Sequence, residues 1–232
     1  MICTPVVAGK QTDALKAIQK SSKLVDVIEL RMDLILDGNV KDLIAAVRAS
    51  SGTVKVLVTN RSDNPSDCPA EKDRIGVLLE AVSLGADFVD LELKAAQRWR
   101  EKLKAAIVKY RNRTKLIVSE HNFSKTPSLK SLLGTYNESV GAGAQIVKIV
   151  TLARKPEDNL RVLSIIPYAR RRNMQIIAFC MGEQGKISRV AAPLLGSFFT
   201  FASLERGSES ASGQLTIVEM KQLLEMLGER KS

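Results

Sequence analysis

The stretch TKLIVSEHNFSKTPSLKSLLGTYNESVGAGAQIVKIV, residues 114–150, contains two short β-branched runs on either side of a longer segment. The runs, at 114–120 and 145–150, are typical of buried strands. The segment between them is long enough for the helix that connects two parallel strands. The stretch therefore predicts a strand–helix–strand unit.

The same alternation extends over the rest of the chain. Between the predicted strands, apolar residues recur at helical spacing, as at Leu43, Ile44 and Val47. Eight strand–helix units favour an α/β fold with one domain over residues 1–232, a (βα)8 TIM barrel, because closure removes both sheet edges. An open doubly wound sheet is the structural alternative. The predicted strands are 2–7, 25–31, 54–59, 88–93, 114–120, 145–150, 175–180 and 197–202.

Length and composition agree with one independent core. The chain has 232 residues, 45% of them hydrophobic, which is enough to bury a core without disulfides or metals. Its three cysteines, Cys3, Cys68 and Cys180, have no C-x-x-C spacing, so we expect a reducing, cytoplasmic location. No run of about 18 apolar residues is present, and we expect no membrane association.

The charge balance is basic, with 35 cationic and 25 acidic side chains and a net charge of +10. Such a surface attracts small anions and nucleic acids alike. Only 4% of the residues are aromatic, which leaves no stacking platform for single strands, so we expect no nucleic-acid partner. The glycines of residues 181–186 are spaced too closely for a phosphate-binding loop, and one histidine cannot build a multi-histidine site. We therefore expect no metal and no cofactor.

Several polar residues lie where predicted strands end, which is where αβ barrels carry their chemistry. Glu29 and Arg31 are two residues apart and share one strand face. They could form a simple ion pair. Asp90 and Glu92 repeat this spacing in the fourth predicted strand, and Arg61 follows the third.

Lys148 interrupts the apolar run Gln145–Val150. Burying an ammonium is costly unless it is paired or loses its proton. A neutral amine in such a place would be a nucleophile toward ketones. The alternatives are a lysine that extends to solvent from the strand end, or one paired to a carboxylate.

His121 is the only histidine, and it follows the fifth predicted strand. It should therefore share a barrel face with Lys148, one strand away. Imidazole can take up and return a proton near pH 7, although a lone histidine is often structural. An imidazole beside an amine indicates imine chemistry with its own acid–base group.

A set of motifs in chain order resembles the type I 3-dehydroquinate dehydratases of the shikimate pathway. The resemblance extends from Ile2 to the helix after Gln214 and depends on the whole set. The motifs are Glu29-Leu-Arg31, Asp90-Leu-Glu-Leu93, Ser119-Glu-His-Asn-Phe123, Val147-Lys148-Ile149, Met181-Gly-x-x-Gly-x-x-Ser188-Arg189, Thr200-Phe201 and Ser210-Ala-Ser-Gly-Gln214.

The resemblance implies a homodimeric TIM-barrel lyase without a cofactor. It would remove water from 3-dehydroquinate to give 3-dehydroshikimate, the third step toward chorismate. Lys148 would form a Schiff base with the substrate, and His121 would move the protons. The implied substrate-binding residues are Glu29, Arg31, Arg61, Arg189, Ser210 and Gln214.

Two departures from the family pattern leave questions open. The family often has a glutamate soon after the residue equivalent to Arg61 that orients the histidine, and this chain has none there. Asp90, Asp63, Asp67 or Glu71 could take its place. The loop between Phe201 and Gln214 is also longer than the resemblance implies.

Two other functions remain possible from the sequence. A lysine-dependent aldolase or transaldolase would use Lys148 in the same way but would need a phosphate site. A basic binding module would have Lys148 as a structural cation.

Overall fold

Parallel strands form a barrel in the computed structural model, which describes residues 1–61 and 70–228. The strand order is β7-β6-β5-β4-β3-β2-β1-β8, so β1 to β7 pair in sequence order and β8 pairs with β1. An open doubly wound sheet would reverse its order about the first strand, so the predicted TIM barrel is confirmed. The strands are β1 (Ile2–Val6), β2 (Val27–Arg31), β3 (Lys55–Thr59), β4 (Phe88–Glu92), β5 (Lys115–Asn122), β6 (Ile146–Leu152), β7 (Gln175–Met181) and β8 (Thr200–Phe201).

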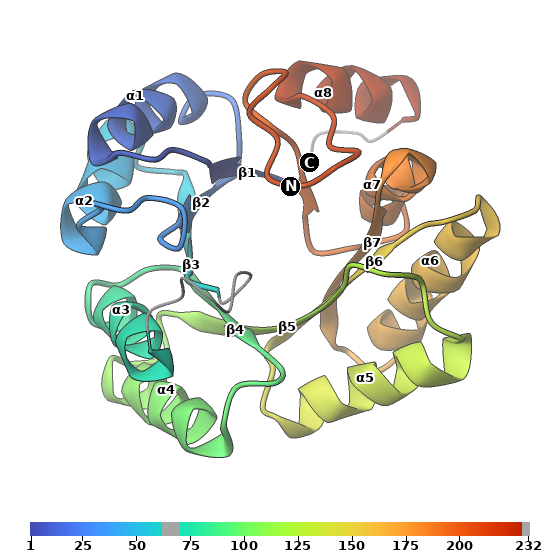
Figure 1. Ribbon diagram of the computed structural model, residues 1–232, viewed down its shortest axis with the longest axis horizontal. Coiled ribbons are helices and arrows are strands. Elements are labelled where there is room, and N and C mark those ends of the chain that lie inside the picture. The colour runs from blue at the N-terminus through green and yellow to red at the C-terminus, as the bar shows by residue number, and fades with distance from the viewer. Residues whose placement is uncertain (62–69, 229–232) are drawn as a thin grey trace.

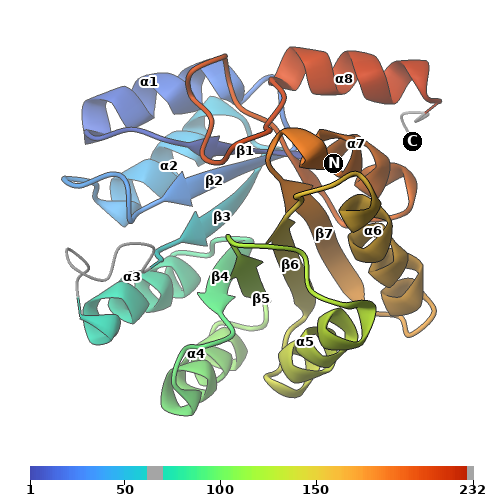
Figure 2. The same ribbon diagram turned by 45° about the vertical axis from the view of Figure 1, so that its right-hand side comes forward.

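The helices surround these strands (Figure 1). The last helix lies between α7 and α1 in both views and so completes the ring (Figure 2). Across residues 1–61 and 70–228, no helix has the length and apolar character to cross a membrane. The helices are α1 (Gln11–Ser21), α2 (Val40–Ser50), α3 (Glu71–Ser83), α4 (Gln97–Lys109), α5 (Leu129–Gly141), α6 (Glu157–Arg170), α7 (Lys186–Leu194) and α8 (Ile217–Met226), with a short 3-10 turn, η1 (Glu183–Gly185), before α7.

The central strands are longer than the sequence predicts. The β5–β6 ladder continues to the pair Asn122–Thr151, and β6 pairs with β7 as far as Leu152. The sequence had suggested that His121 follows the fifth strand. His121 instead lies within β5. It is opposite Val150, and Ser119 is opposite Lys148.

The eighth strand is much shorter than the predicted run 197–202. Ser197 donates its hydroxyl to the carbonyls of Ile176 and Phe199, and the Phe198 amide donates to the same Ile176 carbonyl. These bonds replace a regular ladder with β7 at this seam. They also direct Phe199 into the barrel, where its ring packs against Phe88 at 5.9 Å between centroids.

Alternation along each strand divides the core into two layers. Outward side chains such as Val58, Val118 and Val147 pack under the helices. Inward side chains such as Leu57, Ile117 and Ile146 fill the lower barrel. This period of two also directs the polar residues at the upper ends of the strands into the interior.

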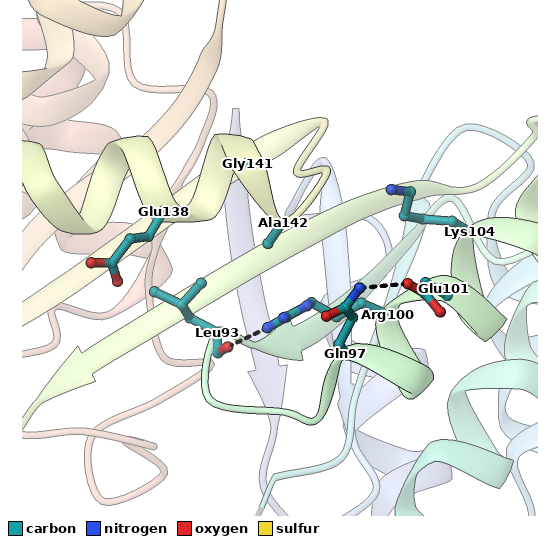
Figure 3. A pocket seen from close by; sticks show the side chains of 8 residues that line it. All are labelled: Leu93, Gln97, Arg100, Glu101, Lys104, Glu138, Gly141 and Ala142. Carbon is teal, nitrogen blue, oxygen red and sulfur yellow. Dashed lines mark hydrogen bonds between the residues drawn. The ribbon is translucent and has the colours of Figure 1, made fainter.

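A hollow of about 470 Å³ lies in the helix layer between α4 and α5 (Figure 3). Arg100 crosses it to donate to the Leu93 carbonyl at 2.9 Å, and Gln97 donates to Glu101 at 2.7 Å. The hollow lies outside the barrel, so its size does not mark it as the site of chemistry.

Leu43 on α2 provides a test of the core. Its side chain is fully buried, and Leu43→Ala should lower the free energy of unfolding by about 2–5 kcal/mol through lost contacts and an internal cavity. Leu160→Ala on α6 is the matched control, because Leu160 is 69% exposed. Urea denaturation measures both, and equal losses would contradict this account of the core.

Candidate active site

A pocket of about 60 Å³ opens at the carboxyl ends of the strands. The structure places all eight sequence-predicted site residues around it. Residues from β2, β5 and β6 share the pocket because the carboxyl ends of parallel strands meet at one face. The lining residues are Glu29, Arg31, Arg61, His121, Phe123, Lys148, Val150, Phe179, Met181, Arg189, Phe201, Ser210, Ala211 and Gln214.

Lys148 is buried, with 2% of its surface exposed. Its Nζ lies 2.8 Å from Asp90 Oδ2 and 3.9 Å from Glu29 Oε1. The ring centroid of Phe201 is 4.6 Å away. Of the alternatives that the sequence left open, pairing to a carboxylate is the one that the structure shows. The Lys148 amine therefore donates to Asp90 and has a second carboxylate close by.

Asp90 holds the centre of this cluster. Besides Lys148, its carboxylate accepts from Arg61 Nη2 at 3.1 Å and from Ser119 Oγ at 2.5 Å. Burial by itself would raise the pKa of Asp90, but the charges of Lys148 and Arg61 outweigh it and hold the pKa far below the usual range. The carboxyl group therefore stays ionised at neutral pH.

The imidazole of His121 is neutral in this environment. Burial lowers its pKa well below the usual 6.5, and the positive charges of Arg61 and Lys148 lower it further, with Asp90 opposing them. A neutral imidazole can accept a proton, which is the first requirement of a general base.

Phe123 is a pocket residue that the sequence analysis left without a role. Its ring stacks on His121, with centroids 5.9 Å apart and planes 19° from parallel. The two residues are two positions apart, so strand alternation could have placed them on the same face. Its exposed position beyond β5 made this hard to foresee.

The four acids proposed to orient His121 have different surroundings. Glu71 is engaged elsewhere, since it accepts from the Ala96 amide at 3.2 Å and from Trp99 Nε1 at 2.8 Å. Asp63 and Asp67 lie outside the described residues. Asp90 faces the cluster, and its charge acts on the imidazole.

Arg189 extends into the pocket from the first turns of α7. This helix begins at Lys186, directly after the 3-10 turn η1. Arg189 donates from Nη2 to the Ser212 carbonyl at 3.2 Å, and its guanidinium lies 4.6 Å from the Phe179 ring centroid. Burial lowers the pKa of Arg189 to about 10, which leaves the group charged at neutral pH.

Backbone contacts hold the last loop over the pocket. The Gly182 amide donates to the Ser212 carbonyl at 3.1 Å, so this oxygen serves both Gly182 and Arg189. Gly213 has a φ of +76°, and a Cβ there would lie 2.3 Å from the Gly182 oxygen. Ser210 and Gln214 bond each other through amide and hydroxyl groups. The loop therefore reaches the pocket edge only because position 213 lacks a side chain.

The pocket at the carboxyl ends of this (βα)8 barrel holds a buried amine, a neutral imidazole and several cations. These features are those of a barrel enzyme that carries out acid–base chemistry on an anionic substrate. The family model described as type I 3-dehydroquinase matches residues 2–231. The chain therefore belongs to the type I 3-dehydroquinase family, whose members are hydro-lyases.

Individual relatives agree with this assignment. The chain is 34% identical to a 3-dehydroquinate dehydratase of Methanococcus maripaludis over 98% of its own length and 100% of that protein. It is 37% identical to the 3-dehydroquinate dehydratase of Methanosarcina acetivorans, over 91% and 88% of the two chains. The crystal structure of 3-dehydroquinate dehydratase from Geobacillus kaustophilus superposes with a TM-score of 0.87 at 29% identity, covering 97% of this chain and 90% of that one.

The lowered pKa of His121 predicts a pH dependence of stability. The unfolded chain binds this proton near pH 6.5, whereas the folded chain binds it only at lower pH. Stability from this group is therefore present above pH 6.5 and is lost as the pH falls toward the folded value. Between pH 7.5 and 5, the free energy of unfolding of the unsubstituted protein should fall more than that of His121→Gln. Urea titrations at several pH values measure this, and parallel curves would rule it out.

Proposed function

We propose that this chain converts 3-dehydroquinate to 3-dehydroshikimate by a syn elimination of water through a Schiff base on Lys148. This is the third step of the shikimate pathway. The observation that carries the proposal is that Lys148, His121 and Arg189 line one pocket. They supply a nucleophilic amine, a proton carrier and a carboxylate receptor.

The first stage is imine formation. The Lys148 ammonium gives up a proton, for which the neutral imidazole of His121 is a suitable acceptor. The free amine then adds to the C3 ketone. The imidazolium of His121 returns its proton to the carbinolamine hydroxyl, which leaves as water and gives an iminium, so His121 is neutral again. The iminium draws electrons and so acidifies the neighbouring C2 proton.

The second stage is elimination. His121 removes the C2 proton, and the electron pair moves through the ring to expel the C1 hydroxyl, which takes up a proton from the same imidazole. One base serves both steps because the proton and the hydroxyl leave from the same face. Water then hydrolyses the conjugated imine, which releases the product and restores Lys148.

The rest of the pocket fits a ring that carries a carboxylate and hydroxyl groups. Arg189 would bind both carboxylate oxygens through its guanidinium. Met181 and Phe201 would pack against the ring. Glu29, Arg31 and Arg61 would bind the ring hydroxyls. Ser210 and Gln214 would add hydrogen bonds from the last loop.

A sugar-phosphate aldolase would use the same lysine. The fold of 3-hexulose-6-phosphate synthase from Salmonella typhimurium superposes with a TM-score of 0.65, but at 15% identity this similarity concerns the barrel alone. We treat the aldolase as an outcome of the trapping experiment below.

We also propose that the enzyme is a homodimer of single-domain subunits (residues 1–232) that works in the cytoplasm without a nucleic-acid partner. The dimer follows from the family resemblance. The described thiols, Cys3 and Cys180, are buried and free, which suits a reducing compartment.

Borohydride reduction tests the role of Lys148. With 3-dehydroquinate present, reduction should add one ligand mass to Lys148 and abolish turnover. Lys148→Ala should reduce turnover by at least about 1000-fold, because the covalent route is lost. Lys155→Ala is the control, since this lysine is exposed beyond the same strand.

Absorbance of the conjugated product measures turnover, mass spectrometry locates the adduct, and circular dichroism shows that the variants fold. Labelling only by a sugar phosphate would favour an aldolase. Turnover retained in Lys148→Ala would refute the mechanism.

Arg189→Ala tests carboxylate recognition. Loss of a charge-assisted, two-point contact should raise KM about 100-fold. Arg189→Lys should restore part of the binding, because it keeps the charge but not the fork. Arg206→Ala on the last loop is the control, since Arg206 is exposed and paired with Glu219 at 2.6 Å. Steady-state kinetics decide, and an unchanged KM in Arg189→Ala would remove Arg189 from substrate binding.

A further inference from the structure

Two hydroxyl groups contact the carboxylates that flank Lys148. Ser119 Oγ donates to Asp90 Oδ1 at 2.5 Å, while the other oxygen of Asp90 lies 2.8 Å from the lysine amine. Thr59 Oγ1 donates to Glu29 Oε1 at 2.7 Å, and this same oxygen is 3.9 Å from the amine. Each carboxylate near the lysine is therefore tied to a neutral donor.

Neither hydroxyl lines the pocket. Ser119 is 1% exposed, and Thr59 has no exposed surface. Both side chains lie on inward strand faces. They therefore act on a substrate only through Asp90 and Glu29.

The two hydroxyl donors change how strongly the carboxylates attract the lysine amine. A hydroxyl that donates to a carboxylate stabilises its negative charge and draws it away from other partners. The Ser119 and Thr59 hydroxyls thus weaken the hold of the two carboxylates on the ammonium. They also fix the carboxylate rotamers, because each bond restricts the rotation of a buried side chain.

We infer that Ser119 and Thr59 are positioning residues that hold Asp90 and Glu29 close to Lys148 and ease the release of its proton. This inference rests on the proposed function. It deepens that function by assigning the control of the lysine amine to two buried hydroxyls.

The other charged and titratable groups near the amine are common to all the variants proposed here. They come from every side of the barrel and stay in place when a hydroxyl is removed. They are Cys3 on β1, Arg31 on β2, Arg61 after β3, His121 on β5 and Arg189 on α7.

The experiment compares hydroxyl-deleting with hydroxyl-retaining variants. Ser119→Ala and Thr59→Val remove the donors, and Thr59→Val keeps the side-chain shape. Each should lower kcat at pH 7 by about 10-fold with little change in KM, as losses of outer supporting groups do. The rising limb of kcat against pH should move to higher pH, because more carboxylate charge then faces the ammonium. Ser119→Thr and Thr59→Ser keep the hydroxyl and should recover most of the loss.

Thr114→Val is the control for deletion of a buried hydroxyl. Thr114 donates to the Ala86 carbonyl at 2.6 Å near the amino ends of the strands, away from the pocket. This variant should lose stability without any movement of the pH profile.

The outcomes separate the two levels of inference. Absence of 3-dehydroquinate turnover in the unsubstituted protein would overturn the proposed function. Turnover in that protein, with unchanged kcat and pH profiles in Ser119→Ala and Thr59→Val, would overturn only the positioning role. A loss of kcat that the hydroxyl-retaining variants do not recover would also overturn it, since packing would then explain the loss.

Discussion

The ion pair between Lys148 and Asp90 is the constraint on which the site depends. Removing two charges from water is expensive, and their attraction offsets the cost only when the remaining hydrogen-bonding positions are filled. In this barrel they are filled, because Asp90 accepts from Arg61 and Ser119 as well as from the lysine. The surrounding strands supply these partners at the register that the barrel imposes. An uncompensated charge at this depth would destabilise the folded state.

The same cluster gives the pocket its electrostatic character. Cations from β2, β6, α7 and the end of β3 line it, and the carboxylates beneath them are already engaged. Burial lowers the pKa of His121, and the positive charges of Arg61 and Lys148 lower it further. The same positive charges also suit an anionic ligand. The same cations therefore influence both the protonation of His121 and the binding of a negatively charged substrate. The basic composition of the chain as a whole says much less about the partner than this local arrangement does.

Much of the fold could be predicted from the sequence because strand and helix periods are local signals. The β-branched runs located every strand, and alternation placed Glu29 on the same strand face as Arg31. The predicted eighth strand is longer than β8, because hydrogen bonds from the Ser197 hydroxyl and the Phe198 amide take the place of a regular strand ladder. The partner of Lys148 lies 58 residues away on another strand, so the sequence left the choice between pairing and deprotonation open. The engagement of Glu71 by Trp99 was likewise unforeseeable, since a side-chain bond between two helices has no local pattern.

The contact between the last loop and Gly182 limits which residues of the loop can be replaced. The Ser212 carbonyl that receives Arg189 is located by main-chain atoms, which amino-acid replacement at the loop's outward positions does not alter. The exposed positions Glu205, Arg206 and Glu209 can therefore change while the anchor for an anionic ligand stays in place. The unexpectedly long loop, with its outward-facing Glu205 and Arg206, is tolerated on this basis. Tolerance ends abruptly at Gly213, where even a methyl group would collide with backbone.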